Sequence, residues 1–354
     1  KAASVLERLA DDGQGEPPIR RKLPPFDQCR GAYRVAKRFH LISVGDALTL
    51  VKVGMMKVGT SLEKHVRAGL GNAGRIWLAG LENTLRALES RWQISVTESF
   101  RSVEYNFVAP AKRDSGEDVV LKIAPPWDPV EIFSEAEFLR HCGGIHCVRL
   151  LEEERPLRAI LIEWLYPGRN LFQVFKGREA EMLLPAAEII AAVSTHATGS
   201  EIEASDVDDW FAGMDGFADT DFPAAYAVRA LKYYREVTKG RIRYYIHGDL
   251  HPENILSTRE GFKVIDPKGA VGHVGYDIAV FLNNFAERLL DDAHPNHDAL
   301  LDHAVQVFAS RFRLHPESIR KWAFCQKVMS AWWMYIDMPQ VYQGDVEKAD
   351  VWGV

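Results

Sequence analysis

The spacing of hydrophobic residues divides the chain into three parts. Residues 1–73 show no sustained period and contain frequent Gly and Pro, which predicts a partly helical extension. The segment IWLAGLENTLRALES (residues 76–90) then places apolar residues close to helical spacing and predicts one amphipathic helix. Strand-like segments dominate from there to residue 165, and helical spacing returns from residue 186.

The middle part predicts a small antiparallel sheet. WQISVTESF, SVEYNFVAPAKR and EDVVLKIAPP read as three strands, and the turn sequence RDSGED joins the last two. A helix at 130–142 and two more strands at 147–154 and 158–165 follow. The final part predicts helices at 186–197, 223–237, 276–290, 299–312 and 318–336.

Composition and charge narrow the class of protein. With 354 residues and 47% hydrophobic residues, the chain can form one large two-lobed domain or two ordinary ones. A net charge of −6 argues against a nucleic-acid partner. Residues 19–75 differ, because they hold 12 Lys and Arg against 3 Asp and Glu. We interpret the extension as packed on the main domain, with a basic surface for an anionic partner as the alternative.

The cysteines and the most apolar stretch bear on location. Four cysteines show no regular framework, which favours unpaired thiols in a reducing compartment, and hence the cytoplasm. The spacing in HCGGIHC (residues 141–147) matches no standard zinc site. Charged residues interrupt LISVGDALTLVKVGMMKVG before it reaches spanning length, so we expect no membrane span.

The segment HGDLHPEN (residues 247–254) carries the chemistry. Asp249 and Asn254 are five residues apart, and Asp266 follows at the end of the strand-like FKVID. Phosphoryl transfer needs a carboxylate to orient the attacking hydroxyl and hard oxygen ligands for Mg²⁺. The string matches the protein-kinase pattern H-R-D-x-x-x-x-N followed by a metal-binding aspartate, with Gly248 in place of the arginine.

Other polar residues are candidates for supporting roles. Lys122, in the strand-like VVLKI, could hold nucleotide phosphates if a helix carboxylate pairs with it. Glu135 is our choice for that partner, with Glu131 and Glu137 as rivals. His247 and Asp277 are expected to support the catalytic loop. His251 is expected either to approach the phosphates or to pack in the protein interior.

With these residues placed, the sequence resembles the aminoglycoside phosphotransferase superfamily, most closely its streptomycin 6-phosphotransferase and hydroxyurea kinase group. The likeness lies in VVLKIAPP, LIEWLYPGRNL, HGDLHPENIL and VIDPKGAVGHVGYDIAVFL, and extends over residues 74–337. It implies an α+β, protein-kinase-like bilobal fold with an N-terminal extension (1–73), an antiparallel-β N-lobe (74–163) and a mainly helical C-lobe (164–354).

The resemblance also implies roles for individual residues. Asp249 would be the catalytic base, Asn254 and Asp266 would bind Mg²⁺, and Lys122 would hold the α- and β-phosphates. The backbone of Glu163 and Leu165 would contact adenine. TESFRS lacks a glycine-rich run, so Ser99 or Ser102 would have to approach the phosphates. Only eleven residues separate Asp266 from Asp277, which leaves no room for a peptide-docking segment.

An acidic stretch suggests the acceptor. Eight Asp and Glu and no Lys or Arg lie between Thr198 and Val228, so a cationic sugar would be attracted there, although a solvated acidic loop explains them equally. Our substrate candidates are Asp206, Asp208, Asp209, Trp333 and Asp337, although helix packing accounts for tryptophans equally well.

We therefore predict a monomeric, cytoplasmic kinase that uses ATP, or alternatively GTP, with Mg²⁺. Its expected acceptor is streptomycin or a related aminoglycoside, and the activity would confer antibiotic resistance. The alternatives are a kinase of another small metabolite, such as hydroxyurea or a sugar, and a nucleotide-binding regulatory protein without catalysis.

Overall fold

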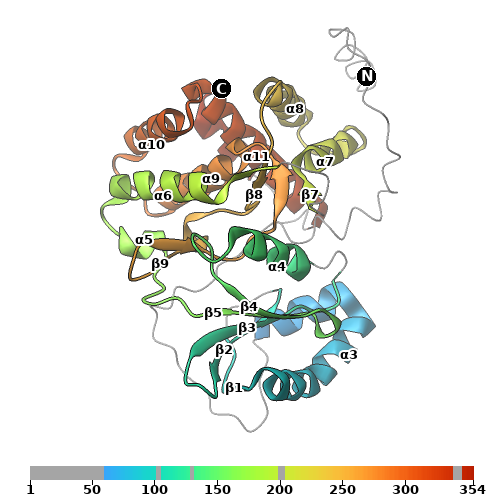
Figure 1. Ribbon diagram of the computed structural model, residues 1–354. Helices are drawn as coiled ribbons and strands as arrows, with labels where there is room; N and C mark the ends of the chain where they lie inside the picture. The colour runs from blue at the N-terminus through green and yellow to red at the C-terminus, as the bar shows by residue number, and fades with distance from the viewer. Residues whose placement is uncertain (1–59, 101–104, 128–130, 198–203, 338–344) are drawn as a thin grey trace.

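An antiparallel sheet and a bundle of helices form two lobes, in agreement with the predicted kinase-like fold (Figure 1). The computed structural model describes residues 60–100, 105–127, 131–197, 204–337 and 345–354. Most of the predicted extension, and with it Ser102 of the predicted phosphate loop, lies outside these residues.

The N-lobe sheet has five antiparallel strands in the order β1-β2-β3-β5-β4. Their bounds are β1 (Ile94–Val96), β2 (Phe107–Arg113), β3 (Asp118–Ile123), β4 (Leu150–Glu154) and β5 (Ala159–Glu163). The predicted meander of the first three strands is confirmed, because β2 pairs antiparallel with both β1 and β3. The alternation of apolar residues in these strands and the turn after β2 favour this pairing. The insertion of β5 between β3 and β4 was not predicted.

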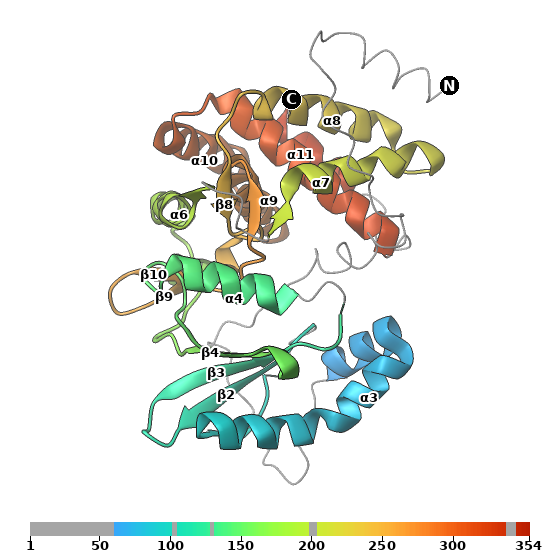
Figure 2. The same cartoon turned by 45° about the vertical axis from the view of Figure 1, so that its right-hand side comes forward.

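Two helices cover opposite faces of this sheet (Figure 2). Leu121 and Ile123 of β3 pack with α3 (Thr60–Trp92), and Ile160 of β5 belongs to the cluster that includes α4 (Glu131–Cys142). Lys122 alternates with its neighbours and therefore lies on the α4 face. α3 starts well before residue 74 and breaks at Gly71, whose φ is 53°, so the predicted domain boundary falls inside it.

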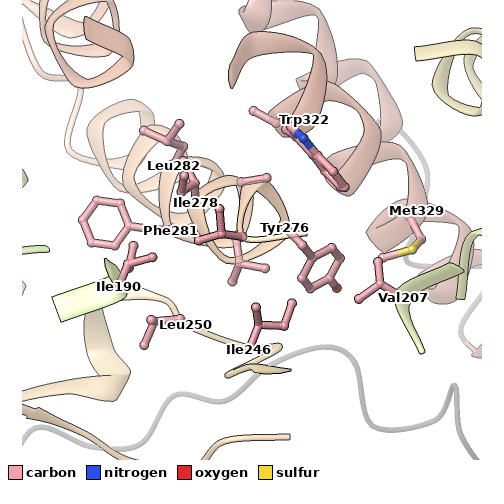
Figure 3. Packing of buried hydrophobic residues seen from close by; sticks show 14 of the residues in the cluster. Ile190, Val207, Ile246, Leu250, Tyr276, Ile278, Phe281, Leu282, Trp322 and Met329 are labelled. Carbon is pink, nitrogen blue, oxygen red and sulfur yellow. The ribbon is translucent and has the colours of Figure 1, made fainter. Parts of the chain in front are cut away.

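The C-lobe is built mainly from helices that pack around α9 and α11. The helices are α5 (Leu171–Val174), α6 (Glu179–Val193), α7 (Val207–Ala212), α8 (Ala224–Thr238), α9 (Gly275–Asp291), α10 (His297–Phe312) and α11 (Pro316–Asp337). Figure 3 shows Tyr276, Phe281 and Leu282 of α9 in the same core as Trp322 and Met329 of α11. The predicted helix at 186–197 is wrong at both ends, because α6 begins earlier and stops before β6.

Short strands hold the loops between these helices. β6 (Thr195–His196), β8 (Tyr244–Ile246), β11 (Ala270–Gly272) and β7 (Ser205–Asp206) form one sheet in that order, and β9 (Ile255–Ser257) pairs with β10 (Phe262–Val264). The 3₁₀ turns are η1 (Arg155–Leu157), η2 (Gly213–Asp219), η3 (Pro252–Asn254) and η4 (Val346–Trp352). These strands flank the HGDLHPEN and VIDPKG segments on both sides, and so bring them together.

Two cysteines correct the expectation of unpaired thiols. Cys142 at the end of α4 forms a disulfide with Cys147, with a Cα–Cα distance of 6.1 Å. Gly143 and Gly144, both with positive φ, turn the chain back between them, which the irregular spacing of the sequence did not reveal. Cys325 remains a thiol in the core. Among the described residues, none of the helices combines the length and the apolar character of a membrane span.

The packing of α9 against α11 predicts that Gly275 cannot be replaced without loss of stability. A Cβ atom at Gly275 would lie 2.4 Å from Nε1 of Trp322, so Gly275→Ala should lower the free energy of unfolding by about 2 kcal/mol or more through overpacking. The matched control is Gly80→Ala in α3, where a Cβ meets nothing within 4 Å and should stabilise the helix by up to about 1 kcal/mol. Urea unfolding curves measure both, and equal effects of the two substitutions would contradict the packing described.

Candidate active site

Backbone hydrogen bonds join the two segments that carry the predicted catalytic residues. The carbonyl of His247 accepts from the N–H groups of Lys268, at 2.8 Å, and Gly269, at 3.1 Å. The carbonyl of Asn254 accepts from Ile265 N–H at 3.0 Å. The loop after β8 and the loop after β10 are thus held side by side, which brings Asp249, Asn254 and Asp266 into one site.

A buried carboxylate fixes the start of the predicted catalytic loop, the segment HGDLHPEN. Asp277, in the first turn of α9, accepts hydrogen bonds from the N–H groups of His247 (2.9 Å) and Gly248 (2.8 Å). Burial raises the pKa of Asp277 to about 7, although the two N–H groups favour its ionised form. Gly248, which takes the place of the arginine in the protein-kinase string, adopts a φ of 82°, a conformation that favours glycine.

His247 supports the loop as a neutral imidazole. Its Nε2 lies 2.8 Å from the carbonyl of Ile265, and its Nδ1 accepts from Asp249 N–H at 3.2 Å. Since Nδ1 accepts, Nε2 carries the hydrogen and donates. Burial lowers the pKa of His247 to about 3. This histidine is therefore unsuited to proton transfer near neutral pH and acts by positioning Asp249.

Lys122 links the sheet, α4 and the segment after β10. Its Nζ lies 2.7 and 2.8 Å from the two carboxylate oxygens of Glu135, and it also contacts Asp266. Burial alone would lower the pKa of Lys122, but the two carboxylates outweigh it and raise that pKa above its ordinary value. Among the rival carboxylates, Glu137 pairs with Arg140 instead.

The other rival, Glu131, lies close enough to the site to sense its charges. Burial raises the pKa of Glu131 to about 7; Lys268 opposes that rise and Asp249 adds to it. The first residue of α4 therefore belongs to the surroundings of Asp249, the predicted catalytic base, a placement that the sequence did not suggest.

The residues expected to bind Mg²⁺ suit that ion. Asn254 is fully buried, its amide NH₂ donates to the carbonyl of Asp249 at 3.0 Å, and its Oδ1 has no hydrogen-bond partner among the described residues. A buried amide oxygen without a partner is costly in a protein, and it is an oxygen ligand of the kind that Mg²⁺ takes. Asp266, one residue past the Ile265–Asn254 hydrogen bond, supplies a carboxylate.

The predicted nucleotide contacts surround the link between the lobes. Glu163 ends β5, and its carboxylate accepts from Arg149 N–H at 2.8 Å and contacts Lys263. Leu165 packs against the C-lobe core. Between these two residues, Trp164 stacks with Phe100, at 6.3 Å between ring centroids.

The predicted phosphate-binding segment TESFRS lies only partly within the described residues. Ser99, which follows β1, lies directly before Phe100. Phe100 N–H donates to the carbonyl of Val108 in β2 at 3.0 Å, so this end of the loop is held against the sheet.

Two predicted substrate carboxylates already have partners. Asp206 caps α7 by accepting from Asp208 N–H at 2.8 Å, and Arg243 contacts it. Asp208 accepts from the hydroxyl of Tyr234 and lies 3.6 Å from Arg243. Both carboxylates therefore hold α7 in place. Asp209, the next residue, is exposed on α7, and the side chain of Asp337 lies outside the described residues.

An aromatic group adjoins the catalytic loop, and sequence reasoning found only one member of it. Trp210 of α7 lies near Gly248, since a Cβ there would be 3.4 Å from the indole ring. Its ring centroid is 5.3 Å from that of Tyr276 and 5.8 Å from that of Trp333, a predicted substrate candidate. Trp332 donates from its indole N–H to the carbonyl of Gly213, and both it and Trp333 are buried in the core, as helix packing would require.

Lys268 is another residue that the sequence analysis did not identify as part of the site. Its Nζ lies 3.8 Å from Oδ2 of Asp249, and the side chains are 14% and 15% exposed. Its position two residues after Asp266 was the one indication in the sequence that Lys268 belongs to the site. The loop that brings Lys268 back to Asp249 depends on hydrogen bonds to the carbonyl of His247, which the sequence does not reveal.

The family is decided by the extent of one match. A model of the aminoglycoside/hydroxyurea antibiotic resistance kinase family matches residues 91–337, which include both lobes and the site described above. The chain belongs to this kinase family. It is accordingly a small-molecule phosphotransferase, and its relatives imply a nucleotide as phosphoryl donor.

The kinase is also similar in sequence to two named phosphotransferases. A streptomycin 6-kinase of Streptomyces griseus is 30% identical over 263 residues, which cover 73% of this chain and 81% of the relative. A hydroxyurea phosphotransferase of Kitasatospora aureofaciens is 29% identical over 237 residues, 63% of this chain and 66% of the relative.

Solved structures share the fold of the kinase at low identity. The choline kinase LicA from Streptococcus pneumoniae has a TM-score of 0.53 and 13% identity, over 76% of this chain and 98% of that one. A choline/ethanolamine kinase family protein from Mesorhizobium loti also has a TM-score of 0.53, with 14% identity over 76% of this chain and 92% of that one. These likenesses show the kinase-like fold.

The buried His247 of the kinase predicts a loss of stability in acid. Its pKa is about 3 in the folded protein, below the ordinary 6.5, so the unfolded chain binds more protons and stability falls as pH drops below 6.5. Between pH 7 and pH 5 this one group should cost about 2 kcal/mol. His247→Gln should lessen the pH dependence by that amount in urea unfolding at the two pH values. The control is His303→Gln on the exposed side of α10, and identical pH dependence in all three proteins would refute the assignment.

Proposed function

We propose that the kinase transfers the γ-phosphoryl group of ATP to a hydroxyl of streptomycin or a related aminoglycoside, with Mg²⁺. We also infer that it acts as a cytoplasmic monomer and confers resistance to the antibiotic. The observation that carries the chemistry is the meeting of Asp249, Asn254 and Asp266 with Lys122 at one site. The observation that carries the substrate is the 30% identity with a streptomycin 6-kinase.

Asp249 acts as the general base in this proposal. Its carboxylate orients the acceptor hydroxyl and takes its proton as the oxygen attacks phosphorus. Backbone hydrogen bonds set the position of the Asp249 carboxylate. Asp277 accepts from the N–H groups of His247 and Gly248, and Nδ1 of His247 accepts from the N–H of Asp249. The catalytic side chain thus extends from a backbone fixed by buried contacts.

The nucleotide is held by residues from both lobes. Lys122, kept in position by Glu135, would contact the α- and β-phosphates, and Ser99 would lie by the phosphates. The backbone of Glu163 and Leu165 would contact adenine. Asn254 and Asp266 would hold Mg²⁺, which neutralises phosphate charge when it is bound.

The acceptor would lie on the Trp210 side of Asp249. Trp210 offers an aromatic face that attracts guanidinium and ammonium groups, and the buried Trp333 packs against it from α11. The exposed Asp209 adds negative charge on the same helix as Trp210. Asp337 ends α11 four residues after Trp333 and is proposed to contribute another carboxylate. Asp206 and Asp208 support this surface by holding the start of α7.

Replacing the proposed base tests the reaction. Asp249→Asn keeps the size of the side chain but removes the proton acceptor, so kcat should fall by about 10² to 10⁴ while the Kd for ATP changes little. The measurement is ADP release with ATP and Mg²⁺ against streptomycin, other aminoglycosides and hydroxyurea.

Each outcome of this panel has a meaning. Streptomycin-dependent release that Asp249→Asn abolishes supports the proposal, whereas release with hydroxyurea alone moves the acceptor to the activity of the second relative. Tight ATP binding without release on any acceptor would favour a regulatory protein. Unchanged turnover in Asp249→Asn would disprove the mechanism.

Trp210 provides a test of the acceptor surface. Trp210→Ala removes a cation–π contact of about 1 to 2 kcal/mol and should raise the KM for the acceptor about tenfold, while the KM for ATP stays the same. Trp210→Phe keeps an aromatic face and should recover part of the loss. Equal changes in both KM values would instead indicate general damage to the lobe.

A further inference from the structure

Lys268 occupies a place that the proposed mechanism leaves unused. It follows Asp266 by two residues, and its N–H donates to the carbonyl of His247 at 2.8 Å. This contact returns the chain to the catalytic loop, where Lys268 Nζ lies 3.8 Å from Asp249 Oδ2. A Cβ at Gly248 would also lie 3.3 Å from Lys268 Cβ, so the lysine stem packs along the same loop.

The ammonium group of Lys268 lies within reach of the phosphoryl group that the proposed reaction transfers. An acceptor hydroxyl that donates to Asp249 lies about 3 Å from its carboxylate, and the phosphorus it attacks is about 3 Å further along. A cation 3.8 Å from the same carboxylate can therefore reach the equatorial oxygens of the transferring group. Those oxygens carry the charge that phosphotransferases must stabilise.

The other buried lysine of the site serves a different position. Lys122 contacts Glu135 and Asp266, and so lies on the nucleotide side. Lys268 lies on the acceptor side, with Asp249 next to it and Glu131 within electrostatic reach. The two lysines thus contact different carboxylates of the site, Lys122 at Asp266 and Lys268 at Asp249.

We propose that Lys268 is a catalytic residue whose ammonium group contacts the phosphoryl group during its transfer. The inference rests on the proposed phosphotransfer. In that step the acceptor oxygen forms a bond to the γ-phosphorus, the bond from that phosphorus to the β,γ-bridging oxygen breaks, ADP leaves, and the acceptor proton passes to Asp249. Lys268 stays protonated and stabilises the oxygens of the transferred group.

The decisive variants are Lys268→Met, which keeps the length of the stem without the charge, and Lys268→Arg, which keeps the charge. Lys268→Met should lower kcat about 10²-fold, with little change in the KM for ATP or the acceptor, because the contact forms in the transition state. Lys268→Arg should recover a substantial part of kcat. The matched control is Lys321→Met, since Lys321 is 19% exposed and pairs with Glu236 and Glu317 in another part of the C-lobe.

A binding assay separates this inference from the choice of acceptor. ADP with Mg²⁺ and aluminium fluoride mimics the transferring phosphoryl group, and the parent protein should bind it more tightly than ADP with Mg²⁺ alone. Lys268→Met should lose most of that preference, while Lys321→Met should keep it.

The inference is overturned if Lys268→Met retains both kcat and the preference for the mimic. It is also overturned if the variant unfolds at a lower temperature and Lys268→Arg fails to restore the preference, because the lysine would then be structural. A parent protein that phosphorylates none of the acceptors disproves the proposed function, but the binding assay still decides the role of Lys268.

Discussion

The structure depends on the pairing of one buried lysine. Lys122 lies on a strand of the N-lobe sheet, and a lysine so deeply buried needs opposite charge beside it. Glu135 from α4 and Asp266 from the C-lobe supply that charge. The same contacts that make burial tolerable therefore fix α4 against the sheet and join the N-lobe to the C-lobe segment that follows β10.

A second buried charge fixes the other half of the site. Asp277 has no cation next to it in the contacts described and is stabilised by two backbone N–H groups of the catalytic loop. A buried acceptor left without donors is costly, so the loop and α9 hold each other in place. Asp249 takes its direction from this arrangement, and Lys268 reaches it through the loop that Asp266 begins.

The N-lobe strands and the candidate site could be predicted from the sequence because short, local patterns of residues indicate them. Alternating apolar residues locate the first three strands, and the string from His247 to Asn254, with Asp266 after it, predicts a phosphotransfer loop. Strands of two or three residues, such as β6 and β7, are too short to show a period. They could not be predicted, and neither could the pairing of loops that they produce.

The remaining features depend on contacts between distant residues. Arg243 neutralises Asp206 from 37 residues away, so the acidic stretch looked more available from the sequence than it is. Trp210 gains its place beside Gly248 through α7, and no spacing in the sequence links the two. The disulfide of Cys142 follows from a tight turn rather than from a framework of cysteines.

The most direct test of the central claim is the mass of the acceptor after reaction. Streptomycin incubated with the kinase, ATP and Mg²⁺ should gain the mass of one phosphoryl group, in a one-to-one ratio with the ADP formed. Streptomycin recovered unchanged while ADP accumulates, or no ADP with any small hydroxyl compound despite tight ATP binding, would contradict phosphoryl transfer to this antibiotic at Asp249.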